Sequence, residues 1–181
     1  MISEQDLLLR AQQLDPCALA EIYDLYSPRL YRYAVRLLGD ACTAEDCVAE
    51  TFSRFLQAIR AHKGPSSYLQ AYLYRTIHNL VVDHYRRQPP LLMLNDDSPG
   101  FGNTEETTDQ NIRKLRVRAA IHELTADQQQ VIALKFLEGW ENEEIAHILN
   151  KPVGAVKSLQ HRALTNLQKI LLSDEVEHVE R

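Results

Sequence analysis

The sequence has little cysteine and no long hydrophobic run, and each shortage excludes a class of protein. Its three cysteines, Cys17, Cys42 and Cys47, form no CxxC pair, so neither a disulfide framework nor a zinc site is expected. No apolar run approaches the ~20 residues that cross a bilayer, and the first residues lack the basic and apolar order of a signal peptide. We therefore expect a cytoplasmic protein with no membrane insertion.

Patterns that would support catalysis or metal binding are also lacking. His78, Asp83 and His84 fall at about 0°, 140° and 240° around a helix, so one helix face cannot bring them to a single ion. No nucleophile stands beside a base at a spacing that would bring the two together. The sequence thus predicts a protein that is not an enzyme, with no catalytic residue, no metal and no cofactor.

A net positive charge, the usual sign of a DNA-binding protein, is absent from the chain as a whole. The formal net charge is −5, but its distribution matters more than its sum. Residues 1–88 and residues 113–181 each carry ten basic and ten acidic residues, whereas residues 89–112 carry five acids and no base. All the net negative charge therefore lies in the middle, and residues 60–88 and 113–172 are locally basic.

What is present first is a series of helix signals in residues 1–88. The predicted starts are Ser3, Asp15 followed by Pro16, and Thr43 with Asp46 as a capping box, and the predicted stops are Gly39 and Pro89-Pro90. These signals indicate helices over 4–13, from 16 to Gly39 with a restart or kink at Pro28, from 43 to 60, and from about Ser67 to Pro89.

Residues 89–112 have the composition of a flexible acidic linker. They hold three of the seven prolines, two of the six glycines and five acids, with no helical period. Helices are expected to resume over about 113–123, 126–138, 142–149 and 153–172, before an acidic tail at 173–181 that frays. The predicted fold is all-α, with two small helical domains, 1–88 and 113–172, joined by this linker.

The clearest motif is NEEIAHILNKPVGAVKSLQHRALTNL, residues 142–167. Asn150 tolerates the left-handed conformation of a tight turn between helices, and Pro152 suits the start of the second helix. That helix has an apolar side and a polar side rich in small and basic residues. The pattern predicts a helix-turn-helix whose second helix enters the major groove. The alternative is a helical hairpin whose polar side is only solvated.

Residues 61–87 interleave tyrosines with cations. Aromatic rings can stack on unpaired bases while cations follow the phosphates, so this stretch suits single-stranded DNA. The alternative is that tyrosines belong to the core. We favour the core for Tyr72, and for the earlier tyrosines Tyr23, Tyr26, Tyr31 and Tyr33.

Three blocks of this sequence resemble the sigma factors of bacterial RNA polymerase, in the extracytoplasmic-function (ECF) group that retains regions 2 and 4. AEDCVAETFSRFL (44–56) looks like the helix that binds the polymerase clamp, and YLYRTIHNLVVDHYRR (72–87) like the segment that melts and reads the minus 10 element. Residues 124–164 are similar to the region that reads the minus 35 element. The resemblance implies region 2 at 1–88 and region 4 at 113–172.

The resemblance also implies a function and its partners. A sigma factor binds core RNA polymerase and directs promoter recognition, DNA melting and transcription initiation, so the partners are the polymerase and promoter DNA, both double-stranded and as the melted non-template strand. Anti-sigma factors are further partners in this family. The alternative function is a two-domain helix-turn-helix transcriptional regulator that acts without the polymerase core.

Site residues follow from the matching positions. The polymerase-binding surface would comprise Asp46, Glu50, Thr51 and Arg54. The minus 10 contacts would be His62, Lys63, Ser66, Ser67, Arg75, Asn79, Arg86 and Arg87. The minus 35 contacts would be Lys157, Ser158, His161 and Arg162. The sequence departs from the family's usual pattern at Ala49, at His78, where an arginine is common, and at Leu159-Gln160.

Overall fold

Two groups of helices make up the described part of the chain, which in this computed structural model is residues 3–87 and 108–179, with side chains at 3–87 and 110–172. Regular structure in these residues is entirely helical, as predicted. The N-terminal bundle contains α1 (Glu4–Gln12), α2 (Pro16–Leu38), α3 (Ala41–Arg60) and α4 (Leu69–Arg87). The C-terminal bundle contains α5 (Thr108–His122), α6 (Ala126–Ile132), the π-helical turn η2 (Ala133–Leu137), α7 (Asn142–Leu149) and α8 (Val153–Val179).

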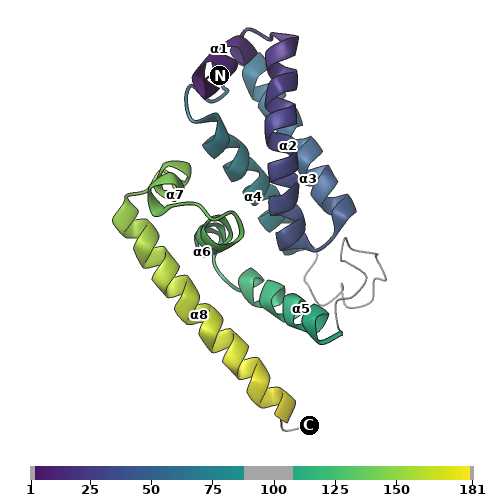
Figure 1. The fold of residues 1–181 in the computed structure, drawn as a ribbon, viewed down its shortest axis with the longest axis vertical. Helices are drawn as coiled ribbons and strands as arrows, with labels where there is room; N and C mark the ends of the chain where they lie inside the picture. Colours follow the sequence, from purple (N-terminus) through teal and green to yellow (C-terminus); the bar gives the residue numbers. More distant parts are fainter. Residues whose placement is uncertain (1–2, 88–107, 180–181) are drawn as a thin grey trace.

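The two bundles lie side by side, with α6 and α7 between α4 and the long α8 (Figure 1). One continuous cluster of buried side chains runs through both bundles, from α2 and α4 to α6 and α7. In the part of the chain that the structure describes, none of the helices combines the length and apolarity that crossing a bilayer demands.

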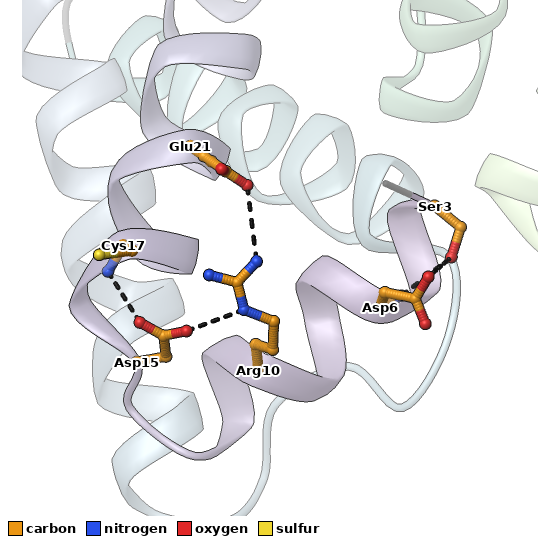
Figure 2. Close-up of polar contacts among 6 residues, drawn as sticks. All are labelled: Ser3, Asp6, Arg10, Asp15, Cys17 and Glu21. Carbon is orange, nitrogen blue, oxygen red and sulfur yellow. Dashed lines mark hydrogen bonds and ion pairs between the residues drawn. The ribbon is translucent and has the colours of Figure 1, made fainter. Parts of the chain in front are cut away.

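The first two helices begin where the sequence predicts. The Ser3 hydroxyl accepts a hydrogen bond from the backbone N–H of Asp6 at 3.1 Å, which caps α1. The Asp15 carboxylate accepts from the N–H of Cys17 at 2.9 Å, and Pro16 occupies the first turn of α2. Each cap satisfies an amide that a helix start leaves without an intrahelical partner. Both caps are visible in Figure 2.

An ion pair also fixes the turn between α1 and α2 (Figure 2). Arg10, near the end of α1, donates to Asp15 at 2.8 Å and lies 3.9 Å from Glu21, one turn into α2. The Arg10 hydrogen bond lowers the pKa of the Asp15 carboxyl below its usual value. The N-cap of α2 is therefore held in its charged, hydrogen-bond-accepting form.

Two local details of the N-terminal bundle differ from what the sequence predicts. The start of α3 is capped by Asp40, whose carboxylate accepts from the N–H of Thr43 at 2.7 Å, and not by a box of Thr43 and Asp46. Of the restart or kink predicted at Pro28, the restart does not occur, because α2 runs unbroken across this proline. Burial of side chains on both sides of Pro28, including Tyr26 and Leu30, outweighs the lost backbone hydrogen bond.

Two helices extend further than the sequence pattern indicated. The first helix of the C-terminal bundle begins at Thr108, five residues before Arg113, and α8 continues through the acidic tail to Val179. Neither extension contains proline or glycine, so nothing in them stops helix propagation once packing has formed the neighbouring turns. The rest of the predicted linker, residues 89–107, lies outside the described residues.

Most tyrosines of the N-terminal bundle belong to its core. Tyr26, Tyr33 and Tyr74 are buried, and the half-buried Tyr72 packs its ring 6.0 Å from that of Phe55. The core interpretation of Tyr72 is thus confirmed. Tyr23 is the exception among the early tyrosines, because it is 49% exposed on the surface of α2.

Candidate nucleic-acid interface

The loop between α3 and α4 carries the first group of predicted contacts. His62, Lys63, Ser66 and Ser67 are all exposed on it. Its backbone is bent by His62, which has φ of 54°, a left-handed value uncommon outside glycine. The polar side chains therefore project from a sharply turned loop rather than from a helix.

Contacts from neighbouring helices hold this loop in place. The side-chain amide of Gln12, in α1, donates to the carbonyl oxygen of Pro65 at 2.9 Å. Gly64 packs so closely on Ile59 of α3 that a Cβ at position 64 would lie 2.6 Å from the isoleucine methyl carbon. The loop is thus anchored at its middle while its exposed polar residues remain free to meet a ligand.

The second group of predicted contacts lies along α4. Arg75, Asn79 and Arg86 are exposed and fall within about 40° of one another around the helix, so they form one stripe. Arg87 is exposed at the C-terminal end of the same helix. We call the stripe Arg75, Asn79 and Arg86 the strand face.

His78 is buried beside the strand face and is not a surface cation. The Nδ1 atom of His78 lies 2.8 Å from the hydroxyl of Tyr33, and Nε2 lies 3.0 Å from the carbonyl oxygen of Ala126. A carbonyl only accepts hydrogen bonds, so Nε2 carries the proton and Nδ1 accepts from Tyr33. Burial lowers the pKa of His78 to about 4, so the imidazole is neutral at physiological pH.

Among the tyrosines of residues 61–87, Tyr68 is the one that the structure leaves well exposed. It is 61% exposed, has φ of 54°, and stacks its ring on that of His147 in α7 at a centroid distance of 5.3 Å. Tyr74 and Tyr85, by contrast, are buried and half-buried, and donate their hydroxyls within the protein. Among these tyrosines, Tyr68 is therefore the candidate for stacking on an unpaired base.

The helix-turn-helix forms between α7 and α8 as predicted. Asn150 has φ of 51° and ψ of 48°, the left-handed conformation that its amide side chain tolerates. The small Ala146 is 8% exposed, and Ile145 and Val156 are fully buried where the two helices meet. This side-chain packing fixes the angle between α7 and α8, and therefore the direction in which the polar side of α8 faces.

The polar side of α8 faces solvent. Its predicted contacts, Lys157, Ser158, His161 and Arg162, are all exposed, and we call them the recognition face. Two of these side chains bond to the carbonyls one turn before them, Ser158 to Gly154 at 2.9 Å and Arg162 to Ser158 at 3.3 Å. Both hydrogen bonds lie within α8, so they do not tie the recognition face to another helix. The recognition face is therefore accessible to a ligand.

The predicted polymerase-binding residues divide into surface and core. Asp46, Glu50 and Arg54 are exposed on α3, with Arg54 donating to Glu50 at 2.7 Å, and we call these three the polymerase patch. Thr51 is fully buried, and its hydroxyl donates to the carbonyl oxygen of Cys47 at 2.7 Å. Assigning Thr51 to the surface is therefore wrong, because its side chain cannot reach a partner.

A polar network between the bundles was not foreseen from the sequence. Glu138, just after η2, accepts from the Tyr74 hydroxyl at 3.2 Å and pairs with Arg36 at 3.3 Å. The ring of Trp140 packs against Tyr74 at 4.7 Å. These residues are far apart in sequence, and no local pattern marks them as partners.

Family comparisons match both bundles. The description "Sigma-70 region 2" matches residues 22–89, and "Sigma-70, region 4" matches residues 114–167. The region 2 match contains the α3–α4 loop and α4, and the region 4 match contains the helix-turn-helix.

Similar proteins extend the match to nearly the whole chain. The ECF RNA polymerase sigma factor BldN of Streptomyces coelicolor is 31% identical over 174 residues, which cover 93% of this chain and 66% of BldN. The ECF RNA polymerase sigma factor SigL of Mycobacterium tuberculosis is 30% identical over 154 residues, which cover 83% of this chain and 86% of SigL.

Solved structures share the fold. The structure of CnrH in complex with the cytosolic domain of CnrY has a TM-score of 0.66 at 22% identity, and covers 94% of this chain and 98% of that one. The sigma factor RpoE of Bartonella quintana, solved with the anti-sigma factor NepR, has a TM-score of 0.55 at 24% identity, with 86% and 97% covered.

Proposed function

This chain belongs to the ECF RNA polymerase sigma factors, and from that premise we propose how its residues divide the work of promoter recognition. Residues 1–88 act as the region 2 domain and residues 113–172 as the region 4 domain, with 89–112 joining them and 173–181 as the tail. Core RNA polymerase and promoter DNA are the partners. The chain itself performs no catalysis, because it acts by positioning the polymerase.

The region 2 domain takes the minus 10 element. The loop residues His62, Lys63, Ser66 and Ser67 receive an unpaired base of the non-template strand. The strand face and Arg87 hold the backbone of that strand and the adjoining duplex. The support is their joint exposure beside an anchored loop, since cations that follow phosphates next to polar and aromatic groups suit single-stranded DNA.

The region 4 domain takes the minus 35 element through the recognition face. Small and basic side chains on the N-terminal half of a second helix match the way helix-turn-helix proteins meet base edges and phosphates. The single observation that carries this assignment is the exposure of all four residues on the outer side of α8, after a left-handed turn at Asn150.

The polymerase patch provides the contact with the polymerase clamp, through Asp46, Glu50 and Arg54. These side chains are presented by α3, whose opposite side is anchored in the core by residues such as Phe55. An anti-sigma factor is a further partner of this chain. The support is that the similar RpoE was solved with the anti-sigma factor NepR.

Run-off transcription on a promoter library tests these assignments. With core polymerase and the wild-type chain, we expect transcripts from a defined set of promoters. The double substitution Lys157→Ala and Arg162→Ala should lower their yield by about tenfold or more, since each lost base or phosphate contact costs about 1 kcal/mol. Capture of the chain by the polymerase should not change.

Lys169→Ala is the matched control, because Lys169 is an exposed cation of α8 beyond the recognition face. It should transcribe like the wild type. Equal losses for Lys169→Ala and the double variant would assign the effect to net charge and reject the recognition face. Failure of core polymerase to bind the wild-type chain would reject the proposed function altogether.

A further inference from the structure

Gly154, the second residue of α8, differs from the other glycines that the structure describes. Gly39 and Gly139 have φ of 79° and 74°, left-handed values that suit glycine. At Gly64 a Cβ would lie 2.6 Å from the methyl carbon of Ile59. Gly154 has neither feature. A Cβ built there would have no atom within 4 Å, apart from its two chain neighbours and the backbone of its own helix.

Glycine at this position has a cost that the fold does not repay. Within a helix, glycine lowers the folding equilibrium constant about two- to fivefold relative to alanine, because its backbone loses more freedom on folding. At Gly154 neither close packing nor a left-handed φ requires the missing side chain. The exposed space over Gly154 therefore has no use within the described chain.

Gly154 lies in the middle of the recognition face. At 100° per residue, Lys157 and Arg162 fall about 60° and 80° from Gly154, on opposite sides of it around the helix. The buried Val156 and Ala163 fall on the far side of α8. Two cations thus border a strip of helix that has no side chain at its centre.

Hydroxyl side chains near Gly154 fold back on the helix. The hydroxyl of Ser158 donates to the carbonyl oxygen of Gly154 at 2.9 Å. The hydroxyl of Thr165 donates in the same way to the carbonyl oxygen of His161 at 3.0 Å. Both hydroxyls therefore stay close to the backbone of α8. The middle of the recognition face is shallow at Gly154, so a ligand can approach the helix backbone closely there.

We propose that Gly154 is a specificity-determining residue of the minus 35 contact, because its missing side chain lets base-pair edges approach α8 directly. This inference rests on the proposed function, which assigns the recognition face to the minus 35 element. The major groove is about 12 Å wide and admits an α-helix. Cations at the two edges of the face suit the phosphate backbones that border the groove. Gly154 then faces the base edges, which carry the sequence.

Gly154→Ala gives the sharpest test, because stability and function should not change together. Alanine suits a helix better than glycine, so the free energy of unfolding in urea should stay the same or rise. Run-off transcription with core polymerase should fall about tenfold on the promoters that the wild-type chain selects, because an added methyl group displaces a close contact. Gly154→Leu should lower it further, and capture of both variants by the polymerase should not change.

Asn166→Ala is the matched control, because it also replaces a weaker helix former by alanine on α8. Asn166 is exposed about 120° around the helix from Gly154, so the substitution adds no volume to the recognition face. Asn166→Ala should transcribe like the wild type. Equal losses for Asn166→Ala and Gly154→Ala would assign the effect to helix stability and overturn the inference.

The promoter library distinguishes contact with base edges from contact with the DNA backbone. Phosphates and sugars carry no direct sequence information. The promoters that Gly154→Ala still uses should therefore differ from those of the wild type at one or two adjacent base pairs of the minus 35 element. An unchanged sequence preference would overturn the inference, whether the yield falls equally on all promoters or does not fall at all.

Failure of this inference can be told apart from failure of the proposed function. The Lys157→Ala and Arg162→Ala double variant tests the recognition face without changing Gly154. Loss of transcription in the double variant, combined with wild-type yield and preference for Gly154→Ala, would keep the region 4 assignment and remove the role of Gly154. Absence of promoter-selective transcription by the wild type would reject the proposed function, and the role of Gly154 with it.

Discussion

His78 shows how a residue's surroundings decide its chemistry. At the position where the family commonly has an arginine, this histidine donates to Ala126 of the other bundle and accepts from Tyr33. Its pKa of about 4 results first from burial, which penalises the charged imidazolium. The side chain contributes a neutral hydrogen bond between the two bundles, and it contributes no cation to DNA.

The low pKa predicts acid sensitivity. The unfolded chain binds a proton on His78 near pH 6.5 and the folded chain near pH 4, so the free energy of unfolding falls as the pH drops through this window. The fall from this residue is at most about 3 kcal/mol. Urea unfolding from pH 7 to pH 4 gives the slope of the free energy of unfolding against pH. In His78→Gln this slope should be smaller by the equivalent of about one bound proton.

His161→Gln is the control for that experiment, because His161 is exposed on α8. It should leave the pH slope of the wild type unchanged. His122, whose pKa burial also lowers to about 4, should account for part of the slope that remains in His78→Gln. An unaltered slope in His78→Gln would mean that this imidazole is not buried in solution.

Thr51 illustrates the same point without charge. It lies three residues after Val48 and four before Phe55, the spacing of one helix face, and all three are buried. The family resemblance assigned Thr51 to the polymerase-binding surface, but helical geometry places it in the core. For Thr51, helical periodicity predicts the environment better than the family resemblance does, because residues on one side of a helix are buried together.

At the scale of the element, the turn between α7 and α8 depends on a single left-handed residue. Asn150→Ala places an ordinary Cβ at φ of 51°, which costs about 1 kcal/mol relative to a residue suited to that conformation. Asn150→Gly should fold with nearly wild-type stability, because glycine adopts this region freely. Thermal and urea unfolding measure both variants.

The consequence for function is specific to the helix-turn-helix. Asn150→Ala should weaken minus 35 dependence in run-off transcription, since a shifted turn misorients α8. Asn150→Gly should preserve it. Equal stability of the alanine and glycine variants would show that the turn does not impose the left-handed conformation.

Some helix ends could be predicted from the sequence alone. Ser3 and Asp15 mark the starts of α1 and α2, because a side-chain oxygen there accepts from a free backbone amide nearby in sequence. Gly39 marks the end of α2, because glycine readily adopts the φ of 79° found there. Asp40 was missed in favour of Thr43 because both residues suit an N-cap, and the choice depends on where the chain leaves α2.

At the scale of the whole molecule, the net negative charge acts against DNA binding by the free chain. The chain carries a net charge of −5, and the recognition face offers Lys157 and Arg162 as its cations. A protein that neutralises about two phosphates shows a slope of roughly −2 in log K against log salt. We expect such a shallow slope and weak affinity for promoter duplex.

Fluorescence anisotropy of a labelled promoter duplex across a salt series measures this slope. Adding core polymerase should convert weak binding into stable, promoter-specific complexes. Tight and sequence-specific binding by the isolated chain at physiological salt would contradict the expectation and favour a regulator that needs no polymerase.

The sequence by itself determined the helices, most of their ends, the helix-turn-helix and the exposure of the recognition face. These follow from caps, from apolar spacing and from the conformational tolerance of Asn150, all of which act within a few residues.

The tertiary structure decided which polar residues are free. Arg75 meets a carbonyl 73 residues away, and Glu138 meets the Tyr74 hydroxyl 64 residues before it. Such pairings arise when two amphipathic bundles bury their apolar sides together, and the bundle orientation then fixes which polar groups face each other. Local sequence carries no record of that orientation, so these contacts between the bundles became visible only in three dimensions.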